Sequence, residues 1–318
     1  MSASASRATR VEVGPPRLKI IVIVNRGGGS AAGAEARIRE AFEGTGVDPE
    51  VRLVEPGELD THCAEVAKAK GISALVAAGG DGTIGTAAAA VADTDMALGV
   101  LPMGTLNHFA RDAGVPLDLK AAAAAIAAGR TRRVDAAEVN GRLFINNSAV
   151  GLYPKLVRAR EAQQRHLGRS KRLAMMIAAA RAMWRFSSSR VTLKVGGGRA
   201  PVETPLLFIG NNKYETGLLA LGTRQAIDRG ELCLYAPLAR SRIGFVWLSL
   251  RAVLGRPDRQ RDFLTLAGIE EAEIHSRRSL LMVALDGEAS MMETPLRYRI
   301  RAGALNLIVP EDEDVTAP

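Results

Sequence analysis

A glycine-rich turn at residues 79–83, Gly-Gly-Asp-Gly-Thr, has the residue types that bind phosphate. It follows an apolar run, Ser73 to Ala78, that predicts a buried strand, and it precedes Thr83 to Ala92, which has helical composition. Between a strand and a helix, glycines allow backbone N–H groups and the helix N-terminus to surround an anion. The alternative is a tight turn with an aspartate cap. The spacing matches neither the P-loop nor the dinucleotide-binding fingerprint.

Asp81, within this turn, brings a negative charge to a site that would hold phosphate. A carboxylate beside a polyphosphate is repulsive unless a cation bridges the two. Asp81 is therefore either a Mg²⁺ ligand or a structural residue that accepts hydrogen bonds.

Two more turns follow predicted strands. The strand Leu18 to Val24 leads into Asn-Arg-Gly-Gly-Gly at residues 25–29, after which Ala31 to Glu43 has helical composition. The strand Met96 to Leu101 leads into Pro102 to Arg111. Open α/β sheets bind ligands at the C-terminal ends of their strands. We therefore expect these turns to contact a nucleotide rather than to be simple flexible connections.

A pair of carboxylates lies near the end of the chain, in Asp286-Gly287-Glu288, after the predicted strand Leu281 to Leu285. Two residues apart on a strand, both side chains would point to one face. A turn at Gly287 would change that arrangement. Taken alone, this tripeptide is an everyday turn.

Taken in order along the chain, these segments resemble the signatures of the diacylglycerol kinase catalytic-domain family, which includes bacterial lipid kinases and sphingosine kinases. Residues 79–83 also resemble a pentapeptide of NAD kinases and, more loosely, of phosphofructokinases. Residues 102–111, Pro-Met-Gly-Thr-Leu-Asn-His-Phe-Ala-Arg, and residues 286–288 favour the lipid kinases. The resemblance covers residues 18 to 310.

The resemblance implies ATP and Mg²⁺ as cofactors. Glu288 is expected to be the base that takes the proton of the attacking hydroxyl. Asp286 is expected to orient the acceptor or to hold Mg²⁺, and Asp81 to be a further Mg²⁺ ligand. The residues expected to contact the nucleotide are Asn25, Arg26, Gly27, Gly28, Gly29, Gly79, Gly80, Asp81, Gly82, Thr83, Gly85, Gly104, Thr105 and Asn107.

Three positions depart from the pattern of the family. Val54 stands where a nucleotide-contacting threonine is common, so that contact is expected to be absent. His108 replaces an aspartate; an imidazole can donate to phosphate or cap a helix, but it is a poor Mg²⁺ ligand. Arg229 replaces an aspartate that binds structural Mg²⁺, so this metal site is expected to be lost unless Asp228 or Glu231 substitutes.

The order of predicted elements indicates two domains. Alternating strands and helices in residues 17–135 predict a Rossmann-like, open parallel sheet. Successive strands in residues 136–304 predict an antiparallel β-sandwich. Residues 1–16 are expected to be a disordered arm, and residues 305–318 a strand that returns to the first domain, followed by an acidic tail. The resemblance implies the same arrangement, that of NAD kinases and diacylglycerol kinases.

The second domain is expected to begin with a hairpin at Asn140-Gly141 and a strand from Arg142 to Val150. Tyr153 to Arg185 is expected to be a basic helix whose apolar stripe packs on its own domain or on an anionic bilayer. Further strands are predicted at Val191–Val195, Val202–Ile209, Leu232–Tyr235, Glu271–His275 and Leu281–Leu285.

The chain of 318 residues has 42 Lys and Arg against 34 Asp and Glu, a formal net charge of +8. This excess suits an anionic membrane surface, a polyphosphate or a nucleic acid. Aromatic residues are not interleaved among the basic ones, which argues against nucleic acid. No apolar run is long enough to span a bilayer and no secretory signal is present. We therefore expect a cytoplasmic protein that contacts membranes peripherally; its oligomeric state stays open, with a homodimer among the alternatives.

The expected activity is ATP-dependent phosphorylation of a hydroxyl of a membrane lipid, with diacylglycerol converted to phosphatidic acid as the default. One alternative is a soluble-substrate kinase of the same superfamily, such as an NAD kinase. The other is a non-catalytic protein that binds nucleotide or lipid. No segment of the sequence has a readable code for the lipid itself.

Overall fold

The computed structural model of the protein describes residues 18–27, 33–151, 189–214, 224, 226–238, 244 and 263–311. Outside these ranges lie the N-terminal arm, Gly28, Gly29, the predicted helix Tyr153–Arg185 and the acidic tail from residue 312.

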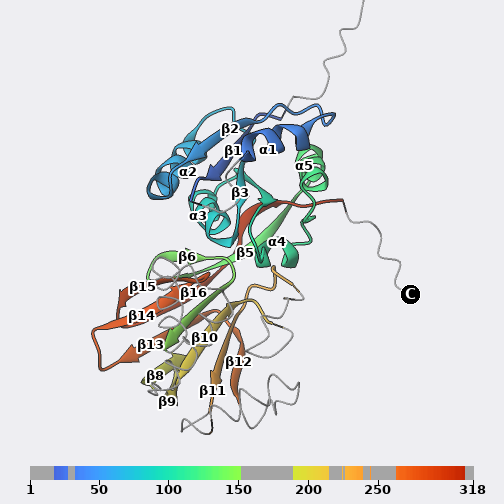
Figure 1. Cartoon of the computed structure of the whole chain (residues 1–318). Coiled ribbons are helices and arrows are strands. Elements are labelled where there is room, and N and C mark those ends of the chain that lie inside the picture. The colour runs from blue at the N-terminus through green and yellow to red at the C-terminus, as the bar shows by residue number, and fades with distance from the viewer. Residues whose placement is uncertain are drawn as a thin grey trace, which may run out of the picture.

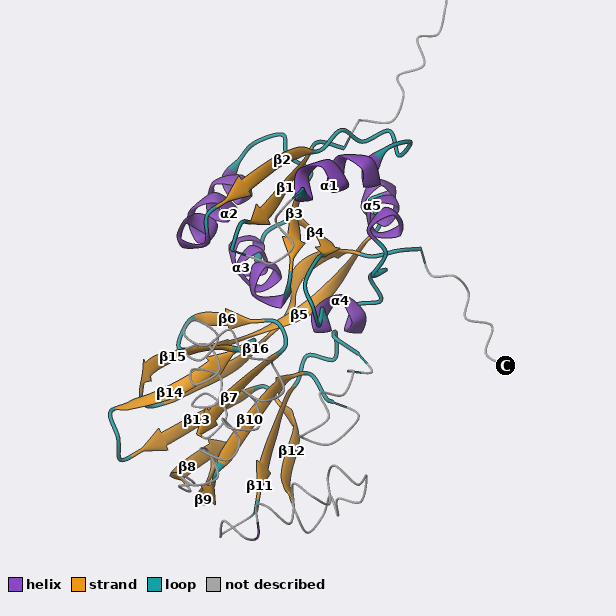
Figure 2. Ribbon diagram, viewed as in Figure 1, coloured by secondary structure: helices purple, strands orange, loops and turns teal. Residues whose placement is uncertain are grey.

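The N-terminal part is a parallel sheet with helices on both faces (Figures 1 and 2). Its strands lie in the order β2-β1-β3-β4, with the bounds β1 (Ile20–Asn25), β2 (Glu50–Val54), β3 (Ala74–Gly79) and β4 (Ala97–Pro102). One face carries α1 (Ala34–Phe42) and α5 (Leu119–Ala128), and the other carries α2 (Leu59–Lys68) and α3 (Asp81–Val91). Two short helices complete this part, η1 (Pro56–Glu58) and α4 (His108–Asp112). The side chains of β1, β3 and β4 are almost all buried, as in strands covered on both faces.

The second part is a β-sandwich, as the sequence predicted. A ten-stranded sheet begins with the four parallel strands and continues through β16 (Leu296–Ile308), β13 (Glu271–Ser276), β8 (Ser189–Val195) and β9 (Gly198–Thr204), with β5 (Thr131–Val139) and β6 (Arg142–Phe144) beside them. A six-stranded sheet has the order β12 (Phe263–Ile269), β11 (Leu232–Pro237), β10 (Leu206–Asn211), β7 (Asn147–Gly151), β14 (Leu280–Leu285) and β15 (Glu288–Glu293). The apolar faces of the two sheets pack together into one core.

Two long strands, β5 and β16, join the two parts of the molecule. They pair antiparallel from Val139 opposite Tyr298 to Thr131 opposite Ile308. Val134 of β5 belongs to the core of the parallel sheet, whereas Val139 belongs to the core of the sandwich. The end of β16 also pairs in parallel with β4, so it completes the first sheet.

The predicted strand 142–150 is in fact two strands, and this prediction was wrong. The hairpin at residues 140–141 is confirmed, with positive φ at both positions. After β6, however, the chain leaves the ten-stranded sheet and enters the six-stranded sheet as β7. At the crossing, the N–H groups of Ile145 and Asn146 donate to the carboxylate of Asp286.

The predicted strand Val202–Ile209 is likewise two strands, β9 and β10, in different sheets. Pro205 lies between them and has no N–H group to donate to a neighbouring strand. The Thr204 hydroxyl instead donates to the carbonyl of Pro237 in β11, at 2.8 Å. Alternation of side chains continues through such a crossing, so the sequence pattern does not show it.

Asp135 is a buried carboxylate at the junction of the two parts. Its Oδ1 accepts the N–H of Gly303 in β16, at 2.8 Å. Its Oδ2 accepts the N–H of Gly230 at 2.6 Å and the side-chain amide of Asn212 at 3.0 Å. Because a buried charge is costly without such partners, Asp135 joins three segments that are distant in the sequence.

We expect Asp135→Asn to lower the free energy of unfolding by about 2 kcal/mol, because the new amide group would face an N–H donor that now binds the carboxylate. Urea unfolding followed by circular dichroism measures the change. Asp95→Asn is the control, since the Asp95 side chain is fully exposed, and should stay within about 0.5 kcal/mol of the parent protein. Equal stability of both variants would contradict the assigned role.

Candidate active site

The turns that follow β1, β3 and β4 lie at one edge of the sheet, because these strands are adjacent and parallel. Asn25 at the end of β1 pairs with Val54, and Gly79 at the end of β3 pairs with Pro102. The helices α3 and α4, which follow β3 and β4, lie next to the β-rich part (Figure 1). The structure therefore brings the predicted nucleotide turns together at the junction.

The turn after β4 packs directly against the turn after β3. A Cβ on Gly104 would lie 2.5 Å from the Cα of Gly80, so only glycine fits there. Asn107, with φ 51°, closes this turn. Its Oδ1 accepts the Gly104 N–H and its Nδ2 donates to the Gly104 carbonyl, both at 3.0 Å. The Asn107 amide thus shapes the turn, while the exposed Thr105 beside it is oriented toward solvent.

Asp81 caps helix α4. Its Oδ1 accepts the N–H of Phe109 at 2.9 Å and its Oδ2 that of His108 at 3.2 Å. A third donor, Nδ2 of Asn146 in the β-rich part, lies 3.3 Å from Oδ1. This is the structural role that the sequence left open for Asp81, and Mg²⁺ ligation by this residue stays a prediction.

Helix α3 begins at Asp81, and its N-cap residue, Gly80, has no side chain that could cap the helix. The first N–H groups of a helix have no partner within it and, with the helix dipole, attract anions. Gly79 makes room for Thr83, because a Cβ on Gly79 would lie 2.6 Å from the Thr83 Oγ1. The first N–H groups of α3 are therefore the donors that we expect to bind the predicted phosphate.

Two carboxylates from the far end of the chain approach this helix. A Cβ on Gly82 would lie 2.8 Å from Oε1 of Glu288, and one on Gly85 would lie 3.5 Å from Oδ2 of Asp286. Gly82 and Gly85 are three residues apart and share one face of α3. Glycine at these positions makes room for the carboxylates, a reason that the sequence alone does not reveal.

Asp286 and Gly287 are the two central residues of the hairpin between β14 and β15. Their φ values are 46° and 90°, and Leu285 pairs with Glu288 across the turn. Of the two arrangements that the sequence left open, the structure has the turn at Gly287, so the two carboxylates do not share one strand face. The Asp286 carboxylate accepts the N–H groups of residues 145–147 at 2.8, 2.8 and 3.0 Å. Asp286 thereby anchors the hairpin from which Glu288 projects.

A cavity of about 490 Å³ opens between the glycine face of α3 and this hairpin. Glu288 lines it, is exposed, and has no hydrogen-bond partner among the described residues. Arg301 also lines the cavity, but Glu138 at 2.6 Å and Asp93 neutralise it. Asp60 at the start of α2 also lines the cavity and is exposed, but Glu288 is the unpaired carboxylate that lies beside Gly82 of α3, and an unpaired carboxylate is what a general base requires.

A buried network that sequence analysis did not single out lies behind this site. The Arg224 side chain has no exposed surface, and its Nε lies 2.6 Å from Oδ2 of Asp112 in α4. Its Nη1 donates to two backbone carbonyls. Its Nη2 donates to Oδ1 of Asn146 at 2.8 Å, which turns the other end of that amide toward Asp81. Arg224 therefore positions the residues that support both carboxylates.

The sequence held one signal for this network. Asn146 and Asn147 interrupt an otherwise apolar predicted strand, and buried amides need partners. The residues next to Arg224 in the sequence do not indicate that its side chain is buried, because its hydrogen-bond partners come from distant segments.

The turn after β1 is described as far as Gly27. Oδ1 of Asn25 accepts the N–H of Gly27 at 2.9 Å, and the Arg26 guanidinium pairs with Glu55 at 3.0 Å. Val54 is buried and offers no hydroxyl to this edge of the sheet. The nucleotide contacts predicted for this turn stay predictions.

The other two positions that depart from the family pattern are His108 and Arg229. His108 is the first residue of α4, and its Nε2 is buried without a hydrogen-bond partner in the described part of the chain. Glu231 accepts the N–H of Gly268 at 2.8 Å, so its carboxylate is already engaged. Asp228 and Arg229 are exposed and line a different cavity.

Asp81 and Asp286 are the two residues that the sequence predicts as Mg²⁺ ligands. No group of three or more His, Cys, Asp or Glu side chains in the described ranges could hold a metal ion. Asp81 and Asp286 each accept three hydrogen bonds, which leaves each carboxylate about one free lone pair. Asp81 and Asp286 therefore do not form a complete metal site by themselves, and Mg²⁺ ligation by either residue stays a prediction.

A helix N-terminus of the kind that binds phosphate lies beside a free carboxylate at the junction of an α/β part and a β-sandwich, and an enzyme of phosphoryl transfer needs both features. The family model of the diacylglycerol kinase catalytic domain matches residues 19–139. A Pseudomonas aeruginosa protein described as a probable lipid kinase YegS-like is 31% identical over 288 residues, 88% of this chain and 86% of that protein. A Pseudomonas fluorescens protein of the same description is 33% identical over 279 residues, 86% and 89% of the two chains. The chain therefore belongs to the diacylglycerol kinase catalytic-domain family, and it is a lipid kinase.

Further comparisons agree with this assignment. The diacylglycerol kinase of Bacillus subtilis is 36% identical over 124 residues, 38% of this chain and 41% of that protein. The crystal structure of a Bacillus anthracis diacylglycerol kinase matches with a TM-score of 0.68 and 19% identity, over 93% of this chain and 98% of that chain. A second structure from that organism has a TM-score of 0.72 at 22% identity, over 92% and 98%. At these identities the structures show the shared fold.

Within the ranges that the structure describes, no helix is both long and apolar enough to cross a bilayer.

We expect Arg224→Met to lower the free energy of unfolding by about 3–5 kcal/mol, because it leaves the carboxylate of Asp112 buried without its partner. Denaturant unfolding measures the loss. Adding Asp112→Asn should recover part of it, since the uncompensated charge is then removed. Arg190→Met is the control, because the Arg190–Glu203 pair is exposed and worth at most about 1 kcal/mol.

Asp286 should give the protein a pH-dependent stability. Burial raises the pKa of its carboxyl to about 6, against the lowering effect of the three N–H groups. The folded state therefore binds a proton that the unfolded state has released. The stabilisation that this proton gives the folded state is fully present below about pH 4 and is lost as the pH rises through about 6. The free energy of unfolding falls by about 3 kcal/mol at most over this range.

Two measurements check this expectation. The ¹³C signal of the Asp286 carboxyl should titrate with a midpoint near pH 6. The free energy of unfolding, measured with urea, should fall between pH 4 and pH 7, and the Asp286→Asn variant should lack this fall. A midpoint near pH 4, the ordinary value for aspartate, would contradict the prediction.

Proposed function

We propose that this kinase transfers the γ-phosphoryl group of ATP to a hydroxyl of a membrane lipid, with diacylglycerol as the acceptor. The position of Glu288 carries the proposal. Its Oε1 lies 2.8 Å from the place of a Cβ on Gly82, beside the uncapped start of α3. A general base next to a phosphate site is what phosphorylation of an alcohol requires.

In the proposed reaction, Glu288 accepts the hydroxyl proton while the hydroxyl oxygen bonds to the γ-phosphorus. The bond from that phosphorus to the bridging oxygen breaks, and ADP leaves. The N–H groups at the start of α3 face the phosphates with the positive end of the helix dipole. Asp286 takes no part in the proton transfer. It positions Glu288, because it anchors the hairpin that carries this residue.

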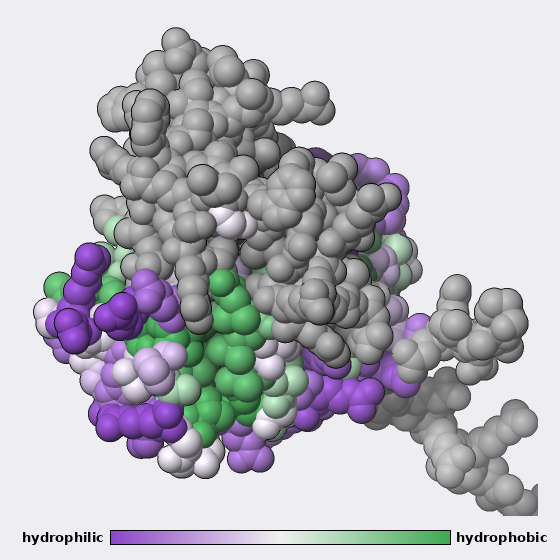
Figure 3. Space-filling model, turned by 90° about the horizontal axis from the view of Figure 1, so that it is seen from below, coloured by the Kyte–Doolittle hydropathy of each residue, from purple (hydrophilic) through white to green (hydrophobic). Residues whose placement is uncertain are grey.

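Surface features support a lipid acceptor and peripheral membrane contact. Seen from the side of the β-rich part, hydrophobic residues gather in one patch bordered by hydrophilic ones (Figure 3). Leu280 and Met291 of the six-stranded sheet are 47% and 49% exposed, and Leu106 in the turn after β4 is 54% exposed. Exposed apolar groups on a chain of charge +8 suit contact with an anionic bilayer. The names of the Pseudomonas and Bacillus subtilis relatives point the same way.

The test is a vesicle assay with diacylglycerol, radiolabelled ATP and Mg²⁺, in which labelled phosphatidic acid should form. Glu288→Gln should reduce kcat by roughly 10²- to 10⁴-fold, the contribution of a general base. Glu293→Gln is the matched control, because Glu293 is an exposed glutamate on the same strand, and it should keep the parent activity.

Two outcomes would contradict the proposal in different ways. Equal activity of Glu288→Gln and Glu293→Gln would exclude Glu288 as the base. Labelling of a soluble alcohol such as NAD, with no lipid product, would exclude the lipid acceptor while leaving the kinase chemistry in place.

A further inference from the structure

Among the described residues, two arginines line the cavity that contains Glu288. One of them, Arg301, is neutralised, because it pairs with Glu138 at 2.6 Å and with Asp93. The other, Arg142, is the first residue of β6; it is exposed and forms no ion pair with any residue that the structure describes. Its guanidinium therefore has N–H groups available to a ligand of this cavity.

A hydrogen bond holds the Arg142 side chain beside the proposed base. Its Nη1 donates to the hydroxyl oxygen of Ser290, at 2.8 Å. Ser290 is two residues after Glu288 on β15, about 7 Å along the strand. Their cross-strand partners, Val283 and Leu285, both belong to the core of the sandwich, so Ser290 and Glu288 share the same face. The guanidinium and the base are thus close enough for one small molecule to contact both.

Helix α3 forms the opposite wall of this cavity. The residues of its lining face, Gly82, Gly85, Thr86 and Ala89, have small side chains or none, and they extend about 10 Å from the start of the helix. A hydroxyl between Glu288 and the start of α3 would lie at one end of this space. The remaining atoms of the acceptor can then occupy the cavity along the helix.

The charges of the cavity favour an acceptor that is itself uncharged. Its described lining contains five carboxylates and two guanidinium groups, so an anionic headgroup would meet more like charge than opposite charge. A carbonyl oxygen, in contrast, is uncharged and accepts hydrogen bonds. The N–H groups of Arg142 that Ser290 does not use can donate to such an oxygen.

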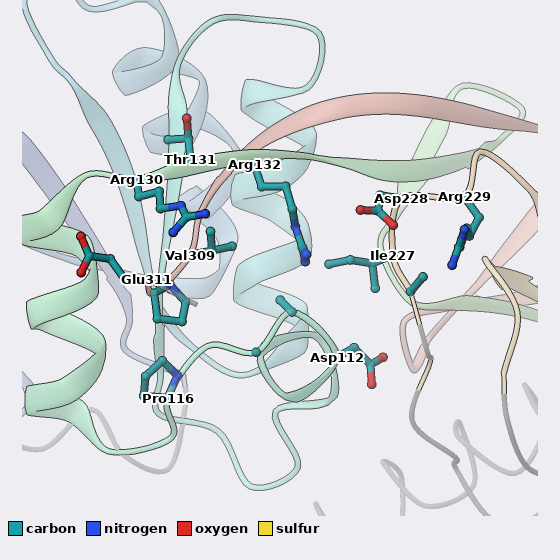
Figure 4. A pocket seen from close by; sticks show the side chains of 14 residues that line it. Asp112, Pro116, Arg130, Thr131, Arg132, Ile227, Asp228, Arg229, Val309 and Glu311 are labelled. Atoms are coloured by element: carbon teal, nitrogen blue, oxygen red, sulfur yellow. The ribbon is translucent and has the colours of Figure 1, made fainter. Parts of the chain in front are cut away.

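The different cavity that Asp228 and Arg229 line lacks this combination. Its volume is about 910 Å³, and it shares no lining residue with the cavity of Glu288 (Figure 4). Three arginines and three carboxylates line it, so the numbers of opposite charges are equal. The acceptor is therefore expected in the cavity of Glu288 and Arg142.

We propose that Arg142 determines the acceptor specificity of this kinase, by donating a hydrogen bond to an ester carbonyl of an uncharged lipid alcohol. This role rests on the proposed function, because Glu288 must take the hydroxyl proton of the same molecule. In diacylglycerol, one ester is on the carbon next to the carbon that carries the hydroxyl, so the hydroxyl can meet Glu288 while this ester meets Arg142. Ser290 holds the guanidinium in place before the lipid binds, which reduces the entropy lost on binding.

The test compares acceptors in micelles of a nonionic detergent, with radiolabelled ATP and Mg²⁺. The acceptors are diacylglycerol, a dialkylglycerol that has ethers in place of the esters, and phosphatidylglycerol as an anionic alcohol. Arg142→Gln should raise the KM for diacylglycerol about tenfold, through the loss of one hydrogen bond from a charged group. Its kcat and its KM for ATP should stay near the parent values, because binding energy that is equal in the ground and transition states affects KM alone.

The dialkylglycerol isolates the contact with the carbonyl. Because this lipid has no carbonyl oxygen, the parent protein and Arg142→Gln should have the same KM for it. Arg199→Gln is the charge-matched control, since Arg199 of β9 is exposed and does not line the cavity; it should keep the parent KM for both lipids. Ser290→Ala, which leaves the guanidinium without its anchor, should raise the KM for diacylglycerol by less than Arg142→Gln does. Thermal unfolding shows whether the variants are folded.

Three results would overturn the proposal. If Arg142→Gln raised the KM equally for both uncharged lipids, or for neither, Arg142 would not recognise the ester, although lipid phosphorylation would stand. Faster phosphorylation of phosphatidylglycerol than of diacylglycerol would exclude the preference for an uncharged acceptor. No product from any of the three lipids with the parent protein would instead contradict the proposed function, and the role of Arg142 with it.

Discussion

Three hydrogen bonds from the backbone of residues 145–147 to the Asp286 carboxylate determine the geometry of the active site. They tie the β14–β15 hairpin to the point where the chain crosses from one sheet to the other. Glu288 is the residue after this hairpin turn, so its position against α3 follows from the same bonds. Burial of Asp286 opposes its ionisation, and the three N–H groups offset part of this cost.

The two parts of the molecule have separate apolar cores, and buried polar side chains also link them at the junction. Asp135 joins β16 to the loops around β10 and β11, and Arg224 joins α4 to the β6–β7 crossing. Buried ion pairs add little to stability, but losing one partner is costly because the other is left unpaired. Such a junction has few alternative arrangements. We infer that it holds the glycine turns and Glu288, the proposed base, in one relative orientation.

Prediction from sequence was most accurate in the parallel-sheet part. Its strands are buried on both faces, so they appear as continuous apolar runs that end at glycine turns, as at Ser73–Ala78. In the sandwich, two of the predicted strands each proved to be two strands in different sheets. The side-chain period of two is the same in both sheets, so a crossing such as that at Pro205 leaves the pattern unchanged.

The sequence by itself determined the local conformations. Asn140-Gly141 and Asp286-Gly287 form turns with positive φ because these residue types tolerate that backbone conformation. Only the tertiary structure decided that Glu288 lies against Gly82, and that Arg224 is a buried support rather than a surface charge. These contacts join segments from opposite ends of the chain. They depend on how two sheets and their junction pack, and no local preference of the residues encodes that packing.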